Sequence, residues 1–159
     1  MERLTIISVL GPDDKHFIKR NIKLIRHLNK DLDCKIELID NFYQEKDQNN
    51  SSIDIVADND EEKYLLKDIK FNLHKGVSQD KKIPKTFRGS YQHAKALNNF
   101  LQTNVINSKY LLVMDPDFFI LLEEWVSKVT DFMENNNIIF FGSPWHPKWF
   151  TKFRYFPSI

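Results

Sequence analysis

Short apolar runs alternate with longer amphipathic segments along most of the chain. The apolar runs have the length of strands, and several are rich in β-branched residues, as is typical of strands buried in a sheet. We expect strands at residues 4–10, 35–40, 69–73, 110–114 and 138–141. Apolar residues recur at helical spacing between these runs, and this spacing predicts helices at residues 16–32, 61–69, 89–103 and 122–134. The alternation predicts a single α/β domain with a mostly parallel central sheet flanked by helices on both faces.

Three segments lack this pattern. Residues 42–63 are polar except for a short apolar run at 53–56 that could form a minor strand, and we interpret the segment as a surface loop or insertion. Residues 77–87 have a similar loop-like composition. Residues 143–159 are aromatic and basic but have no clear period.

The composition excludes several classes of protein. Lys and Arg together number 23 and Asp and Glu 22, so the net charge gives no reason to expect binding to nucleic acid or to an anionic membrane. The single cysteine, Cys34, rules out a disulfide within the chain and fits a reducing compartment, where we expect it to pack in the core. No apolar stretch has the length of a membrane span, and the N-terminal run is too short for a signal peptide. We expect a cytoplasmic protein that could act near a membrane on a lipid-linked substrate.

The stretch with the clearest chemistry is residues 109–120, with the sequence KYLLVMDPDFFI. Its apolar run should form a buried strand at the centre of the sheet, which Pro116 ends because proline has no N–H to continue the pairing. Asp115 and Asp117 would then lie at the carboxyl end of that strand, where ligands bind in open α/β sheets. Two oxygen ligands in a turn suit Mg²⁺ or Mn²⁺ holding a phosphate. Two solvated acids at a strand end would give the same pattern.

The order of four features resembles nucleotide-sugar glycosyltransferases of the GT-A type, near the large family 2 of inverting transferases. The features are an opening strand, helix and strand that end in Asp40, the helix motif of residues 89–98, the Asp115-Pro-Asp117 strand end, and a later strand followed by Gly142-Ser-Pro-Trp-His146. The helix motif consists of Gly89, Ser90, His93, Ala94, Leu97 and Asn98. The resemblance covers about residues 3–146 and implies a Rossmann-like nucleotide-binding fold.

The resemblance also implies roles for the acidic residues. The Asp-x-Asp element of such enzymes holds a divalent cation on the nucleotide diphosphate, so Asp117 is the best metal ligand and Asp115 faces the ribose or the metal. The acid that closes the second strand usually contacts the base, which gives this role to Asp40. Asp58 is a rival for the same role, because the insertion at 42–63 blurs the correspondence.

Two basic side chains lie near the start of the predicted helix at 89–103: Arg88 just before it and His93 within it. By the same resemblance, residues 85–93 line the nucleotide pocket, where Arg88 and His93 could pair with phosphate. His93 could equally be a structural histidine at a helix interface. The family's general base and third metal ligand come from the acceptor-binding portion, which this sequence does not match, so we assign no catalytic base.

The resemblance divides the chain into a nucleotide-sugar-binding core at 1–142 and the start of an acceptor-side segment at 143–159. The expected partners are a nucleotide-diphosphate sugar and a glycan or lipid-linked acceptor, and a homo-oligomer could complete the acceptor side. We expect the six aromatic residues of 143–159 to pack in part over the carboxyl end of the sheet.

Two other functions remain open at this point. The chain could be a non-catalytic module that binds a nucleotide sugar without transferring it. The apolar run before Asp-x-Asp is also similar to the motif of haloacid dehalogenase-like phosphatases, in which the first Asp is a nucleophile. Those enzymes place the motif near the N-terminus and follow it with a second acidic pair, which residues 118–159 lack at any expected strand end.

Overall fold

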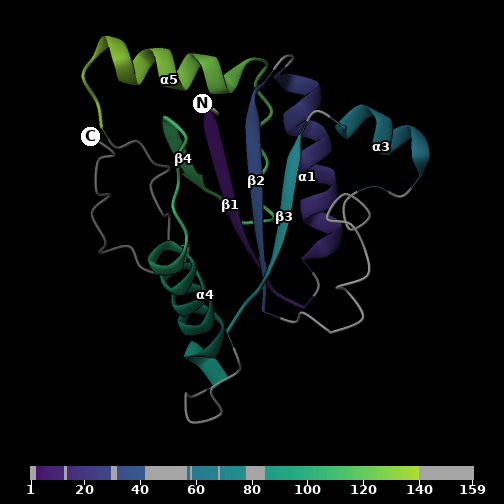
Figure 1. Cartoon of the computed structure of the whole chain (residues 1–159), viewed down its shortest axis with the longest axis vertical. Coiled ribbons are helices and arrows are strands. Elements are labelled where there is room, and N and C mark those ends of the chain that lie inside the picture. Colours follow the sequence, from purple (N-terminus) through teal and green to yellow (C-terminus); the bar gives the residue numbers. More distant parts are fainter. Residues whose placement is uncertain are drawn as a thin grey trace, which may run out of the picture. The chain divides into compact units, whose positions relative to one another are not determined.

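The computed structural model describes residues 3–12, 14–29, 32–41, 57, 59–67, 69–77 and 85–139 (Figure 1). For residues 62, 65 and 85–88 only the backbone is described. The chain divides into two compact units, Met1–Glu123 and Glu124–Ile159, and each is treated by itself. The described part of the chain contains no helix that is both long and apolar enough to cross a membrane.

The first unit is built on a parallel sheet of four strands in the order β3-β2-β1-β4. Its strands are β1 (Leu4–Leu10), β2 (Cys34–Asp40), β3 (Lys70–Lys75) and β4 (Tyr110–Val113). Within the described residues, its helices are α1 (Lys15–Leu28), α3 (Asp60–Leu66) and α4 (Lys85–Thr103). The α/β prediction is confirmed, and the arrangement is Rossmann-like. The predicted bounds of β1 match the structure, and those of β2 and β4 differ by one residue, because compact apolar runs mark these strands clearly.

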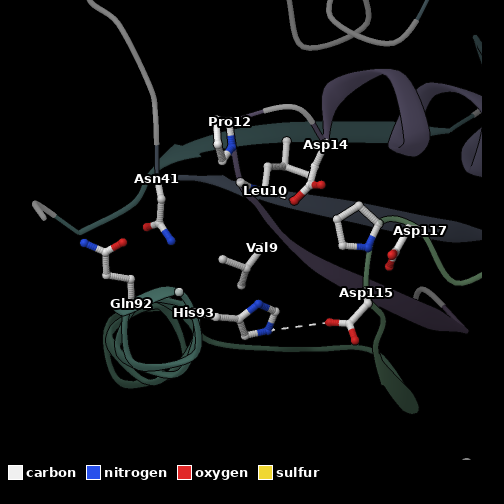
Figure 2. Close-up of a pocket in the computed structure, with 12 residues that line it drawn as sticks. Val9, Leu10, Pro12, Asp14, Asn41, Gln92, His93, Asp115 and Asp117 are labelled. Carbon is white, nitrogen blue, oxygen red and sulfur yellow. Dashed lines mark hydrogen bonds and ion pairs between the residues drawn. The ribbon is translucent and has the colours of Figure 1, made fainter. Parts of the chain in front are cut away.

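The strand order gives the sheet a switch point between β1 and β4. The chain moves from β1 to β2 to β3 in one direction, and α4 then carries it back past β1 to β4 on the other side. In open α/β sheets, ligands bind at such a switch point, in the crevice outside the carboxyl ends of the strands. Leu10, at the end of β1, and Asp115, just after β4, both lie at this crevice (Figure 2).

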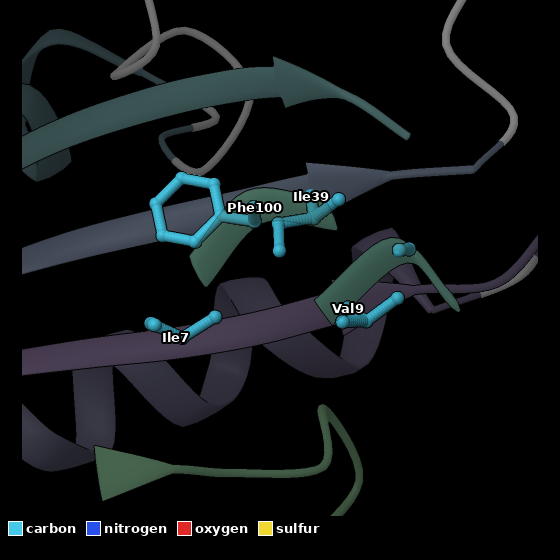
Figure 3. Packing of buried hydrophobic residues seen from close by; sticks show 5 residues of the cluster. Ile7, Val9, Ile39 and Phe100 are labelled. Atoms are coloured by element: carbon cyan, nitrogen blue, oxygen red, sulfur yellow. The ribbon is translucent and has the colours of Figure 1, made fainter. Parts of the chain in front are cut away.

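α4 covers one face of the sheet. Ala96 and Phe100 of α4 form a buried cluster with Ile7, Val9 and Ile39 of the two central strands (Figure 3). Side chains alternate along a strand, so these three strand residues share one face. Burial of a large aliphatic or aromatic side chain contributes about 1.5–3 kcal/mol, and this cluster therefore fixes α4 on the sheet.

α1 lies on the opposite face. Ile18, Ile22 and Ile25 are its buried apolar residues, at the spacing of one helix face. Asp40 alternates with Ile39 and so points away from α4, and its carboxylate is 3.1 Å from the Nζ atom of Lys15 at the start of α1. The sheet is thus covered by helices on both faces, as the sequence predicted.

The environment of β4 was predicted wrongly. We expected a buried central strand, but β4 is at the edge of the described sheet and pairs only with β1. Leu111 and Val113 are 46% and 44% exposed. An apolar run indicates a strand without indicating how many neighbours the strand has, which explains the error.

Some predicted elements lie partly or wholly outside the described residues. The minor strand at 53–56 and the segment 143–159 are outside them. In the predicted strand at 138–141, Ile138 and Ile139 are described, and neither belongs to a strand or a helix. In the second unit, α5 (Trp125–Asn135) confirms the last predicted helix, in which Trp125 and Val126 are buried and Phe132 is half exposed.

A charged cluster also lies on the face that α4 covers. Glu37 of β2 is buried and pairs with Lys35, with the ring of His74 at 2.6 Å and with Asn72 at 3.3 Å. Burial raises the pKa of Glu37, but hydrogen bonds from His74, Lys35 and Asn72 outweigh it and lower the pKa to about 2 from the ordinary 4.5. These partners come from β2 and β3, so the cluster holds the two strands together.

The Glu37 cluster predicts a specific pH dependence of stability. A carboxylate whose pKa is lowered by folding stabilises the fold above pH 4.5, and this contribution is lost as the pH falls toward 2. Glu37→Gln should therefore lower the free energy of unfolding by roughly 2–3 kcal/mol at pH 7. Below pH 4.5 the difference in this free energy between the variant and the natural sequence should shrink progressively as the pH falls. Urea unfolding across this pH range measures the difference, with the exposed Glu61→Gln as control. A deficit that stayed constant down to pH 2 would contradict this account.

Candidate functional site

A pocket of about 310 Å³ opens at the carboxyl end of the sheet, beside the switch point (Figure 2). Its walls come from the end of β1 and the turn that follows, from the residue after β2, from α4 and from the turn after β4. The volume is at the small end of the range for small-molecule sites. The pocket thus lies where the strand order predicts ligand binding.

The turn after β4 presents the two candidate metal ligands. Met114 still pairs with β1, through an N–H that donates to the carbonyl of Ile7 at 3.0 Å. The chain then reverses in a turn closed by the N–H of Phe118, which donates to the carbonyl of Asp115 at 3.1 Å. Pro116 occupies the second position of this turn, which its fixed φ favours. Asp115 and Asp117 are both exposed at the pocket, as carboxylates that bind a metal must be.

Asn21 of α1 holds this turn from behind. Its side chain is 1% exposed, and its Nδ2 donates to the carbonyls of Pro116 at 3.2 Å and Phe118 at 2.8 Å. Nδ2 also lies 3.8 Å from the sulfur of Met114. A buried polar residue within a helix therefore fixes the backbone that carries the two carboxylates.

His93 and Asp14 add ionisable groups to the pocket. His93 projects from α4, and its Nε2 is 3.9 Å from Oδ1 of Asp115 (Figure 2). Asp14 lies just before α1, and its Oδ2 accepts a hydrogen bond from the N–H of Gly11 at 2.6 Å, which shapes the turn after β1. Four ionisable residues thus line the described pocket: three acids and one histidine.

Asn41 and Gln92 contribute neutral amides. The Oδ1 of Asn41 accepts a hydrogen bond from the N–H of Val77 at 3.1 Å, which ties the end of β2 to the segment after β3. A Cβ at Gly76 would overlap the Asn41 side chain, so this close approach requires glycine. Gln92 is buried in α4 and also lines the pocket (Figure 2).

The structure brings together only some of the residues that the sequence suggested. Asp115, Asp117 and His93 all line the pocket. Asp40 does not, because it points to the α1 face, where its side chain is 0% exposed and paired with Lys15. Arg88 lies in the first turn of α4, next to the pocket residue Gly89, and its side chain is not described.

The sequence analysis did not identify several residues of the pocket and its support. The rival candidate Asp58 lies outside the described residues. Asn41 directly follows Asp40 at the end of β2, and of these two residues Asn41 lines the pocket. Gln92 directly precedes His93 in the helix motif. Asn21 gave a weak signal as a polar residue on the otherwise apolar side of a helix.

The donor set fits a divalent cation that binds mainly through a phosphate ligand. Among the described residues, no three His, Cys, Asp or Glu side chains form a group that could hold a metal by themselves. Mg²⁺ commonly takes only one or two carboxylates from the protein and completes its shell with water and substrate phosphates. Asp115 and Asp117, exposed on one turn, could supply such a partial set.

No protein-family model matches the sequence, and the comparison with curated proteins found no match either.

The contacts of Asn21 predict that this residue orders the carboxylate turn. Asn21→Ala would leave two carbonyls without their donor, and it should lower the free energy of unfolding by about 1–3 kcal/mol. It should also speed hydrogen exchange at the Phe118 amide, which closes the turn. Asn99→Ala, at an exposed position inside α4, controls for the change in helix propensity. Unchanged exchange at Phe118 would show that Asn21 does not hold the turn.

Proposed function

We propose that the chain binds a nucleotide-diphosphate sugar together with Mn²⁺ or Mg²⁺, and that it belongs to a glycosyltransferase that moves the sugar to an acceptor hydroxyl. The observation that carries this proposal is the acidic turn at the switch-point pocket. Its two carboxylates are exposed and lie on one turn, and Asn21 holds the backbone of that turn.

The charges of the pocket favour a metal-bound diphosphate over a free one. The described lining includes Asp14, Asp115 and Asp117, whose negative charges would repel a diphosphate. A divalent cation on Asp115 and Asp117 would offset their two negative charges and offer its remaining coordination positions to phosphate oxygens. Diphosphate binding should therefore require the metal, and metal binding should be strengthened by the diphosphate.

Two basic residues support the same assignment. His93 faces Asp115 across the pocket, where in its protonated form it could hydrogen-bond a phosphate oxygen. Arg88 immediately precedes Gly89 in the chain and is a candidate for a second phosphate contact. Both would stabilise the charge that develops on the diphosphate as the sugar leaves.

Transfer needs a leaving group whose charge is neutralised and an acceptor hydroxyl that a base activates. A bound metal would supply the first by acting as a Lewis acid on the diphosphate. Asp115 and Asp117 would hold that metal, and the turn would orient it toward the pocket. We assign no residue to the second role. The same proposal includes an acceptor, which is a glycan or a lipid-linked sugar. It also includes a second copy of the chain, which would complete the acceptor side.

The binding step can be tested directly. Titration of the protein with Mn²⁺ and a nucleoside diphosphate should show coupled binding, and Asp117→Asn should weaken it by roughly tenfold or more because one of two charged metal ligands is lost. Asp33→Asn, at an exposed position outside the pocket, is the matched control. Calorimetry measures both variants, and equal binding by Asp117→Asn and the natural sequence would reject the site.

Product analysis separates the candidate functions. A glycosyltransferase should release the nucleoside diphosphate and attach the sugar to an acceptor. A non-catalytic module would bind the nucleotide sugar and leave it intact, while a phosphatase would release phosphate from a simple ester without any acceptor. Hydrolysis of a simple ester that depended on Asp115 would replace the present proposal with the phosphatase.

A further inference from the structure

The pocket has two chemically different ends. Asp115 and Asp117 follow β4, whereas Asn41 follows β2, and β1 lies between those strands. Two strand spacings separate the ends by about 10 Å, so one small group cannot contact both. Figure 2 shows Asn41 and Gln92 on one side of Val9 and the carboxylates on the other. A ligand that uses the whole pocket must therefore be extended.

The amide end contains a polar group that the fold does not use. Gln92 is 6% exposed, and within the described part of the chain its Nε2 has no hydrogen-bond partner. A buried amide without a partner destabilises a protein, so its presence calls for a separate explanation. Asn41, its neighbour, differs because its Oδ1 is committed to the N–H of Val77. Gln92 is thus an amide whose donor the described fold leaves unused.

The surroundings of Gln92 define the kind of group that it could bind. Among the described lining residues, Asn41 and Gln92 are neutral, whereas the four ionisable residues are Asp14, His93, Asp115 and Asp117. Val9, Leu10 and Pro12 add apolar surface to the same pocket. A flat, neutral ring that carries adjacent hydrogen-bonding groups on its edge fits these properties, and a phosphate or a carboxylate does not.

We propose that the Gln92 carboxamide hydrogen-bonds the edge of the nucleobase and so determines which nucleotide the pocket accepts. This inference rests on the proposed function, because it takes the metal-bound diphosphate to lie at the carboxylate end. A carboxamide offers one donor and one acceptor side by side, which match the paired groups on a base edge. Binding of the base would also supply the partner that Gln92 lacks in the free protein.

The test compares ligands with and without a base. Binding of uridine, guanosine, cytidine and adenosine diphosphates and of pyrophosphate, each with Mn²⁺, is measured for the full chain and for Gln92→Met, which keeps the length of the side chain but cannot hydrogen-bond. The variant should bind the preferred nucleoside diphosphate about tenfold more weakly, lose the preference among bases, and bind pyrophosphate as before. Gln102→Met, at an exposed position in the same helix, should change nothing.

Thermal unfolding of the ligand-free protein gives an independent readout. Because Nε2 has no partner in the described fold, Gln92→Met should not lower the melting temperature, whereas a structural glutamine would show a loss. A lower melting temperature, or an equal loss of affinity for pyrophosphate, would overturn the inference. Nucleotide preferences that the substitution leaves intact would also overturn the inference. Metal-dependent diphosphate binding would in that case still support the proposed function. If the natural sequence bound neither pyrophosphate nor any nucleotide with Mn²⁺, the proposed function would fail and this inference with it.

Discussion

The pairing of β1 with β2 along one edge and with β4 along the other is the constraint on which the rest of the site depends. In this arrangement β1 runs parallel to both neighbours, so all three strands end on the same side of the sheet. The pocket lies at these carboxyl ends, at the switch point between β1 and β4. The hydrogen bond from Met114 to Ile7 extends this pairing to the last residue before the carboxylate turn. The position of Asp115 and Asp117 therefore follows directly from the register of β1 with β4.

Each helix that covers the sheet also contributes to the pocket. α1 packs on one face and uses the buried Asn21 to hold the backbone of the carboxylate turn. α4 packs on the other face through Ala96 and Phe100, and the same helix presents Gln92 and His93 to the pocket. The core contacts that stabilise the fold thus also set the positions of the candidate binding residues. Asn21 and Gln92 are accordingly buried polar residues in helices that are otherwise fixed by apolar packing.

The sequence predicted the strands well and their environment less well. β1 consists almost wholly of apolar residues, so its bounds could be predicted from local composition. Strand order is not a local property, and β4 was therefore placed at the centre of the sheet rather than at the edge of its described part. The position of Asp40 was not predictable for a similar reason. Successive side chains of a strand point to opposite faces, so Asp40 meets α1 while Asn41 reaches the pocket, and only the arrangement of the helices distinguishes the two. The carboxylates after β4 were easier to predict, because a proline marks the strand end whatever its neighbours are.

The central claim is that a divalent cation binds at the carboxylate turn together with a diphosphate. Mn²⁺ is paramagnetic and broadens the NMR signals of nearby amides, so addition of substoichiometric Mn²⁺ with a nucleoside diphosphate would locate the ion directly. We expect the signals of Gly11, Gly89 and Asp117 to broaden first, since these residues surround the pocket. Broadening centred instead on the exposed acids Asp60 and Glu61 of α3, with the pocket amides unaffected, would contradict the account.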